Sequence, residues 1–120
     1  MQERNKRRIG AEAEQQIRQY LMEHGYIILE MNYRCRQGEV DIIARRGQYY
    51  VFIEVKYRSS DRYGMPEEAV GISKQRRISR AALYYLYSHQ LPETTPVRFD
   101  VAAIYEKNVH YIQNAFDYIY

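Results

Sequence analysis

The chain has 120 residues, with 18 basic and 15 acidic side chains and a net charge of +3 at pH 7. That length suits one domain with one core, and the single cysteine, Cys35, leaves no internal disulfide and no cysteine-based zinc cluster. A charged start and the lack of a long apolar run predict neither a signal peptide nor a membrane span, so the cytoplasm is the expected compartment.

The first predicted element is a helix from about Ile9 to His24, ended by Gly25. At about 100° per residue its apolar stripe includes Ile17 and Leu21, and Glu14 falls within the same arc. A buried carboxylate must be paired or must bind a metal. Glu14 is therefore either a site residue or the partner of a nearby basic residue on the helix.

Three strands follow in the predicted order. Tyr26–Tyr33 is the first, and a basic turn, Arg34–Gly38, leads into the second. The second and third, Val40–Ala44 and Tyr49–Tyr57, are rich in β-branched and aromatic residues. We expect Gly47-Gln48 to join them as a two-residue type II′ turn, which fixes the register of the hairpin.

Counting outward from this turn puts Asp41 opposite Glu54 and Glu39 opposite Lys56, all on one face. The other face is filled by apolar residues, namely Val40, Ile42, Val51, Ile53 and Val55. Two opposed carboxylates, with Cβ atoms about 4.5–5.5 Å apart, destabilise a hairpin, and Mg²⁺ would offset that repulsion. Lys56 could then orient or deprotonate a water molecule bound to that ion, or stabilise charge on the transition state of phosphodiester cleavage. The plain alternative is an ion pair of Lys56 with Glu39, with both acids in solvent.

The segment after the hairpin is polar and carries glycine and proline. Ser59–Pro66 is predicted to be a mobile loop beside the site, followed by a short helical turn at Pro66–Val70. The second helix is expected from Ser73, as N-cap, to about Ser88. Its first turns are basic, which the helix dipole disfavours unless phosphate binds there. The alternative is an ordinary solvated basic face.

Two more strands, Val97–Tyr105 and Val109–Gln113, complete the pattern. The order is helix, three strands, helix, two strands, which predicts an α/β fold with a mixed β-sheet flanked by helices. Of the 18 basic residues, 14 are arginine and 4 are lysine, which suits a phosphate-rich partner but also fits a bias of genome composition. The 14 tyrosines could stack on unpaired bases or fill half-buried edges.

Several short patterns carry a resemblance to a known family. They are GEVDIIA, FIEVKYR, the pair Lys74 and Arg77, RFDV and NAF. Together they resemble the YraN family of small bacterial proteins. That family is itself similar to the PD-(D/E)xK nuclease superfamily, particularly to archaeal Holliday-junction resolvases. The resemblance runs from Glu14 to Phe116 and implies one restriction-endonuclease-like domain, 1–120. Val40 stands where the superfamily usually has proline, and Ala13 where relatives often have glycine.

The resemblance also implies a site. Asp41, Glu54 and Lys56 would form the signature triad, with Glu14 as an additional acid. Mg²⁺ or Mn²⁺ would be held by Asp41, Glu54, the Val55 carbonyl and Glu14. Contacts to nucleic acid are expected from the basic turn and the second helix, at Arg34, Arg36, Lys74, Gln75 and Arg77.

The expected function is a metal-dependent nuclease that hydrolyses DNA phosphodiester bonds, with branched or structured DNA as one substrate class that the resemblance raises. The alternative is a nucleic-acid-binding module that keeps the nuclease scaffold without cutting. Junction resolvases act as dimers to make two symmetric cuts, so the resemblance raises a homodimer too, which the sequence does not specify. No membrane partner is expected.

Overall fold

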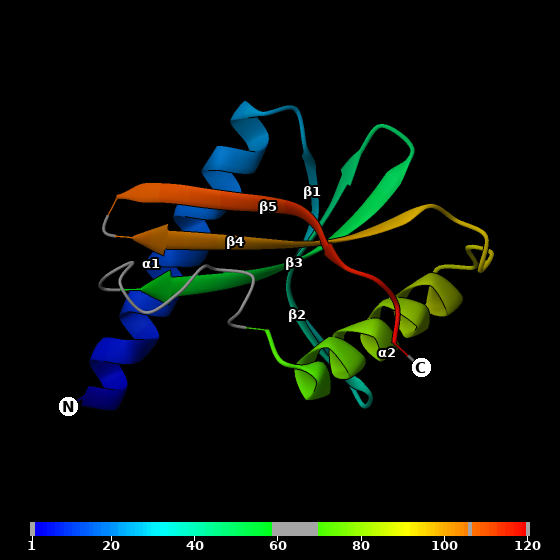
Figure 1. Ribbon diagram of the computed structural model, residues 1–120, viewed down its shortest axis with the longest axis horizontal. Helices are drawn as coiled ribbons and strands as arrows, with labels where there is room; N and C mark the ends of the chain where they lie inside the picture. Colours follow the sequence, from blue (N-terminus) through cyan, green and yellow to red (C-terminus); the bar gives the residue numbers. More distant parts are fainter. Residues whose placement is uncertain (1, 59–69, 106, 120) are drawn as a thin grey trace.

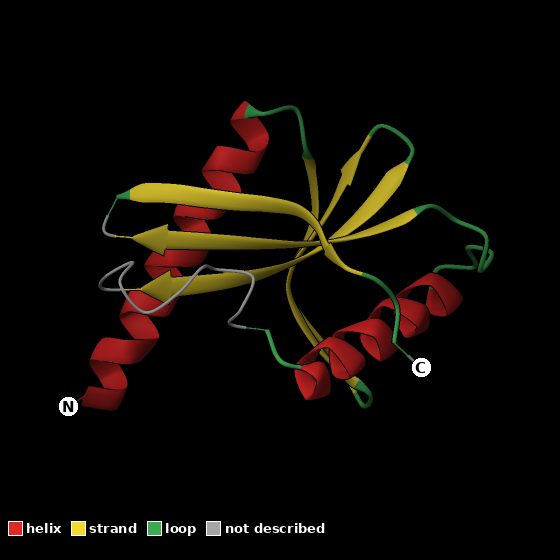
Figure 2. Cartoon of the chain, viewed as in Figure 1, coloured by secondary structure: helices red, strands yellow, loops and turns green. Residues whose placement is uncertain are grey.

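One mixed sheet separates two helices that cover its opposite faces (Figure 1). The computed structural model describes residues 2–58, 70–105 and 107–119. Its elements are α1 (Gln2–Glu23), β1 (Ile27–Cys35), β2 (Gly38–Arg46), β3 (Tyr49–Arg58), α2 (Ile72–Ser88), β4 (Val97–Tyr105) and β5 (Asn108–Phe116). The strands lie in the order β1-β2-β3-β4-β5, with β3 parallel to β4 and the other neighbours antiparallel (Figure 2). The predicted α/β architecture and element order are confirmed.

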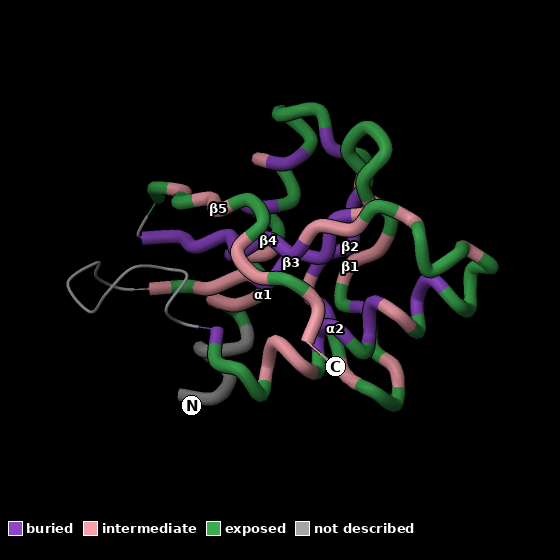
Figure 3. Tube along the Cα trace, turned by 45° about the vertical axis from the view of Figure 1, so that its right-hand side comes forward, coloured by how far each residue is buried: buried purple, intermediate pink, exposed green. Residues whose placement is uncertain are grey.

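Each helix packs against one face of the sheet and forms a hydrophobic cluster with it. Ile17 and Leu21 of α1 pack in a cluster with Ile42 and Ile53, whereas α2 packs on the other face in a cluster that includes Phe52. Residues that alternate along a strand point to opposite faces, so β3 supplies Ile53 to one layer and Phe52 to the other. The strand β4 is buried along most of its length (Figure 3), and β3 is buried in its middle, at 51–54.

The helix α1 begins at Gln2, well before the predicted start at Ile9. The charged segment ahead of Ile9 is rich in straight-chain residues, which have high helix propensity. It ends at Glu23, one residue before the predicted end at His24, and Gly25 closes it as predicted, since Gly25 has a φ of +87° and the Tyr26 N–H donates to the Leu21 carbonyl at 2.9 Å. None of the helices in the described ranges is long and apolar enough to cross a bilayer.

The predicted hairpin register is confirmed between β2 and β3. Arg46 pairs with Tyr49, and the pairing continues in step to Ile42 with Ile53. Gly47 has a φ of +60°, as the first central position of a type II′ turn requires. The register holds because the turn and the alternating burial specify the same alignment.

The predicted face of Val40 is wrong. Val40 packs in the α2-side cluster with Ile43, while Ile42 lies in the α1-side cluster. At this end β2 pairs with β1, and the partner of Val40 is Tyr33, whose ring meets the Tyr85 ring of α2 edge-on at 5.4 Å. The change of face coincides with an irregularity in the neighbouring strand, because Asn32, between the partners of Ile42 and Val40, has a φ of +55°.

The predicted N-cap of α2 is also wrong. Gly71 is the N-cap, with extended backbone, and its carbonyl accepts the first helical hydrogen bond from the Gln75 N–H at 2.9 Å. Ser73 lies inside the first turn and is exposed. The predicted loop Ser59–Pro66 and the predicted turn Pro66–Val70 lie outside the described residues, except for Val70.

The strand β5 runs past its predicted end at Gln113 because it contains an irregularity. Asn114 has a φ of +54°, and the register of β4 with β5 shifts between Phe99 and Val101. Asparagine tolerates this left-handed conformation, so the strand continues to Phe116, which stacks on Phe99 at 5.1 Å.

Candidate active site

The two acids of the predicted site meet where β2 parts from β3. Backbone pairing runs to Ile42 and Ile53, and one residue further on Asp41 Oδ2 accepts a hydrogen bond from the Val55 N–H at 2.8 Å. The side chain of Asp41 thus bonds a backbone N–H of β3 at the point where the two strands separate. This places its carboxylate beside Glu54, as the hairpin register predicts.

Burial and mutual repulsion act strongly on the Asp41 carboxyl group. Burial raises its pKa most, and the charge of Glu54, a hydrogen bond with Glu54 and the charge of Glu14 raise it further, to about 7. The Val55 N–H bond acts in the opposite direction. Glu54 itself is only 4% exposed. The Asp41 carboxyl group therefore keeps its proton up to near neutral pH, and a divalent cation would compete with that proton.

Two lysines neutralise Glu54. Lys74 Nζ lies 2.7 Å from Glu54 Oε2, and Lys56 Nζ lies 3.5 Å from the same oxygen. Burial alone lowers the pKa of Lys74. The hydrogen bond to Glu54 and the charges of Glu54, Asp41 and Glu39 outweigh burial and raise this pKa above its usual value. Glu54 therefore receives one ammonium group from β3 and another from the first turn of α2.

The plain alternative for the hairpin, a Lys56–Glu39 pair with both acids in solvent, does not match this geometry. Lys56 pairs with the buried Glu54, and Glu39 instead lies 3.8 Å from Arg34 Nε in an exposed ion pair. An exposed pair at that distance contributes little to stability. Asp41 and Glu54 lie in a partly buried site, where their charges interact strongly with any bound ion.

The residues present suit a hard divalent ion with few protein ligands. Asp41 and Glu54 supply carboxylate oxygens, and Val55, hydrogen-bonded to Asp41 through its N–H, could add its main-chain carbonyl. Across the described side chains, no three His, Cys, Asp or Glu residues lie close enough together to hold a metal ion. Glu14 is near enough for its charge to act on Asp41, and its role as a further ligand stays a prediction. Mg²⁺ commonly takes one or two carboxylates and completes its shell with water and phosphate.

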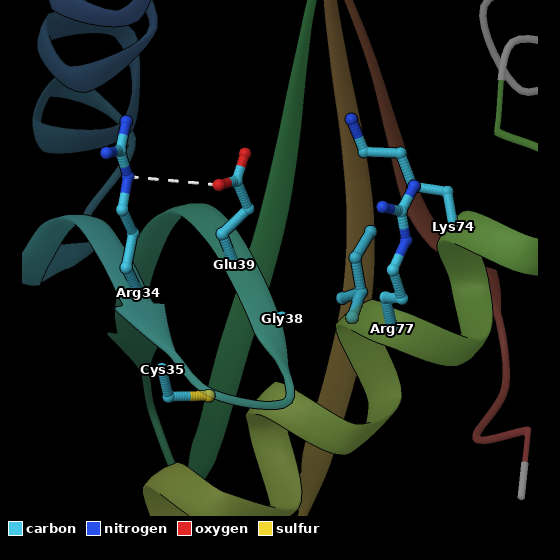
Figure 4. Close-up of a pocket in the computed structure, with 7 residues that line it drawn as sticks. Arg34, Cys35, Gly38, Glu39, Lys74 and Arg77 are labelled. Atoms are coloured by element: carbon cyan, nitrogen blue, oxygen red, sulfur yellow. Dashed lines mark ion pairs between the residues drawn. The ribbon is translucent and has the colours of Figure 1, made fainter.

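A cavity of about 360 Å³ lies between the end of β1, the start of β2 and the start of α2, and its lining includes Lys74, which contacts Glu54. Figure 4 shows Arg34 and Glu39 on one side and Lys74 and Arg77 on the other. Gly38 makes this arrangement possible. A Cβ atom at Gly38 would lie 2.6 Å from the Arg77 carbonyl oxygen, so only glycine lets the helix approach the strand this closely.

The predicted nucleic-acid contacts therefore divide into two groups. Arg34, Lys74 and Arg77 line the same cavity. Arg36 is exposed in the turn between β1 and β2. The side-chain amide of Gln75 donates a hydrogen bond to the Val70 carbonyl at 2.9 Å. This bond stabilises the segment directly before α2.

Another buried acid, Asp100, has a structural role. It is fully buried, and its carboxylate accepts hydrogen bonds from Arg98 at 2.7 Å, from the Tyr111 hydroxyl at 2.6 Å and from the Asn114 N–H at 2.9 Å. The Tyr26 hydroxyl contacts the same guanidinium group. These bonds use the oxygens of Asp100 within the protein and tie β4 to the irregular part of β5.

Sequence reasoning missed the direct contact of Lys74 with Glu54 and the close approach at Gly38. The glycine itself was a usable signal, because an interior or terminal strand glycine often marks a close backbone approach. Nothing in the local pattern around Lys74 indicates which acid it reaches, since the contact depends on how α2 crosses the sheet.

The element order and sheet define a restriction-endonuclease-like α/β protein that carries two acids and a lysine where β2 and β3 part. The chain belongs to the family described as "Uncharacterised protein family UPF0102", the YraN family, whose model matches residues 13–104. A UPF0102 protein of Lachnoclostridium phytofermentans is 52% identical over 94% of this chain and 96% of its own length. One of Syntrophus aciditrophicus is 50% identical over 94% and 91%, and one of Thermodesulfovibrio yellowstonii is 47% identical over 90% and 95%.

Proposed function

We propose that this protein is a metal-dependent nuclease that hydrolyses phosphodiester bonds in DNA. The observation that supports the proposal is that Asp41 and Glu54 lie close together where β2 and β3 separate, with Lys56 Nζ 3.5 Å from Glu54 Oε2. Opposed buried carboxylates destabilise a fold unless something neutralises them. A site that brings them together beside a basic cavity suits a divalent ion and a phosphate.

The side chains have distinct roles in this proposal. Asp41 and Glu54, with the Val55 carbonyl, would hold Mg²⁺ or Mn²⁺, and such an ion would polarise the scissile phosphate and lower the pKa of its bound water. Lys56 orients the attacking water and donates to the negative charge that develops on the phosphate oxygens. Arg34 and Arg77 hold a neighbouring phosphate in the cavity, which fixes the strand relative to the acids.

A second candidate function is a nucleic-acid-binding module that does not cut. The observation in its favour is that Glu54 already has two ammonium partners, Lys74 at 2.7 Å and Lys56 at 3.5 Å. A site neutralised by its own lysines is stable without a metal ion. The basic cavity would serve phosphate binding equally well in both functions.

Incubation of the protein with linear, flap and four-way-junction DNA separates the two candidates. Reactions contain Mg²⁺ or Mn²⁺, and the wild-type chain is compared with Asp41→Asn and Lys56→Ala. We expect the wild type to cut at least one substrate and both variants to bind DNA without cutting. Branched DNA as the preferred substrate would also favour a homodimer, which sedimentation of the protein with a junction would detect.

Binding by the wild type with no cleavage under any condition would support the non-catalytic module instead. Cleavage that both substitutions leave unchanged would place the activity at another site or in a contaminant. The variants retain the fold if their far-UV circular dichroism matches that of the wild type.

A further inference from the structure

A second cavity follows the first along α2. Its volume is about 370 Å³, and it lies between the second half of the helix, the turn after β1 and the segment after the helix. Its lining is mostly apolar or aromatic with an arginine at one side, and includes Gln37, Arg80, Leu83, Tyr84, Tyr87 and Leu91.

The two cavities share one flank of the helix. At 100° per residue, Arg77, Arg80, Tyr84 and Tyr87 fall within about 80° of one another, outside the arc that packs on the sheet. The turn between β1 and β2 runs beside this flank, because Gly38 lines the first cavity and Gln37 lines the second. From Arg77 to Tyr84 the helix rises about 10 Å, so the two cavities form successive parts of one track.

Two tyrosines, Tyr84 and Tyr87, are exposed to solvent on this track. Tyr84 is 41% exposed and Tyr87 is 78% exposed, and their ring centroids are 6.4 Å apart with an interplanar angle of 42°. Neighbouring exposed rings on a basic helix face have a flat apolar surface that water solvates poorly. A ligand with alternating phosphates and flat rings would match both the cations and the tyrosines.

We propose that an unpaired strand of nucleic acid runs along this track, away from the acid pair. Its backbone phosphate occupies the first cavity at Arg34, Lys74 and Arg77, and its bases stack on Tyr84 and Tyr87. The position of the cut rests on the function proposed above, but the binding does not. A duplex keeps its base faces stacked internally, so the tyrosines contribute only when the strand is unpaired.

The charge of the track favours nucleic acid over a second copy of the chain. Arg77 and Arg80 lie on the same flank as the tyrosines, and Glu93 is the acidic residue that lines the second cavity. Two copies that met through this flank would bring their arginines together, which is unfavourable. A polyanion gains from the same arrangement.

The test measures binding in a chelator, where no cleavage occurs. Fluorescence anisotropy measures the binding of a short labelled DNA single strand of mixed sequence and of the blunt DNA duplex of the same sequence. The variants are Tyr84→Leu/Tyr87→Leu, which keeps apolar side chains without rings, and Tyr84→Trp/Tyr87→Trp, which keeps rings. The matched control is Tyr57→Leu. Tyr57 is 44% exposed and points to the α1 side of the sheet, two residues after Val55.

We expect the leucine double variant to bind the single strand about tenfold more weakly and the duplex with nearly unchanged affinity. The tryptophan double variant and Tyr57→Leu should bind both like the wild type. Arg77→Gln should bind both ligands more weakly. It should also reduce the slope of the logarithm of the binding constant against the logarithm of the salt concentration by about one, because one phosphate contact is lost.

Equal binding of the single strand by the wild type and a folded leucine variant would overturn the proposal, as would no binding by the wild type. Equal losses on the single strand and the duplex would remove the preference for an unpaired strand. A change of sedimentation coefficient in the leucine variant, with unchanged binding, would make the track an interface between copies. If the protein binds the single strand as expected but does not cleave DNA, the nuclease function is contradicted. The proposed binding of an unpaired strand is then still supported.

Discussion

Lys74 Nζ lies 2.7 Å from Glu54 Oε2, closer than Lys56 Nζ at 3.5 Å from the same oxygen. Glu54 is buried, whereas the side chain of Lys74 is 36% exposed. The helix α2 therefore inserts a cation into the place where a divalent ion would meet the acid pair. A bound ion and Lys74 compete for Glu54, and a Lys74 displaced from Glu54 would remain beside the phosphate cavity that it lines.

This competition predicts that Lys74→Met binds Mn²⁺ about fivefold more tightly than the wild type, the effect of losing an interaction near 1 kcal/mol. Methionine keeps the length of the side chain and removes the charge. Isothermal titration with Mn²⁺ measures the affinity, and Lys74→Arg, which keeps the charge, should stay near the wild type. Weaker Mn²⁺ binding by Lys74→Met would mean that the lysine supports the ion site.

The Asp41 carboxyl predicts a pH-dependent stability. Its pKa rises from 3.8 to about 7 on folding, so the folded chain holds this proton more tightly than the unfolded chain. The stabilisation is fully present below about pH 4 and is lost as the pH rises through 7. Asp41→Asn carries no charge and can still accept from the Val55 N–H. Relative to the wild type it should gain roughly 2–4 kcal/mol in unfolding free energy between pH 4 and pH 8.

Urea denaturation in a chelator across this pH range measures the difference between the two proteins. Glu12→Gln is the matched control, because Glu12 is an exposed acid on α1. A difference between Asp41→Asn and the wild type that does not vary with pH would contradict the raised pKa.

The close approach of α2 to β2 predicts that Gly38→Ala is strongly unfavourable. The new Cβ would lie 2.6 Å from the Arg77 carbonyl oxygen, and backbone at that distance can yield only if the helix moves. We expect a loss of about 1–3 kcal/mol, typical of overpacking, together with weaker binding of nucleic acid. Thermal unfolding and anisotropy measure the two effects.

Gly10→Ala supplies the comparison for that substitution. Gly10 lies inside α1, and nothing lies within 4 Å of the position of its Cβ. This change should stabilise the protein by about 0.5–1 kcal/mol through helix propensity. Equal effects of the two alanine substitutions would show that α2 does not depend on contact at Gly38.

The buried Asp100 network predicts a large stability loss without a direct effect on chemistry. Asp100→Asn leaves Arg98 with an uncompensated charge, since the side chain of Arg98 is 13% exposed, and about 3 kcal/mol should be lost. Tyr111→Phe removes one hydrogen bond and should lose about 1 kcal/mol, which keeps the test informative if the first variant does not fold. Asp117→Asn, at an exposed acid, should have little effect in the same urea titration.

Much of the candidate site follows from local sequence. The II′ turn at Gly47 and the alternating burial each specify the same register, and that register brings Asp41 to Glu54. The strand β4 matches its predicted range because an apolar run fills both faces of a central strand. These features depend on neighbours in the chain and on a period of two residues.

Features set by how distant elements cross were not predicted. The face of Val40 changes beside the positive φ of Asn32 in β1, where Val40 packs against α2, and the contact of Lys74 with Glu54 depends on how α2 lies against the sheet. The end of β5 was placed too early because Asn114 adopts a positive φ that Asp100 stabilises from the next strand. In each case a residue far along the chain decides the local structure.

The role of Lys56 in a nuclease site is tested by single-turnover cleavage of labelled DNA in Mn²⁺ by the wild type, Lys56→Gln and Lys107→Gln. Lys107 is an exposed lysine in the turn before β5 and serves as the matched control. The proposed nuclease site predicts metal-dependent cleavage by the wild type and Lys107→Gln, and a rate at least about a hundredfold lower for Lys56→Gln with DNA binding retained. Cleavage by Lys56→Gln at the wild-type rate, or no cleavage by any of the three, would contradict it.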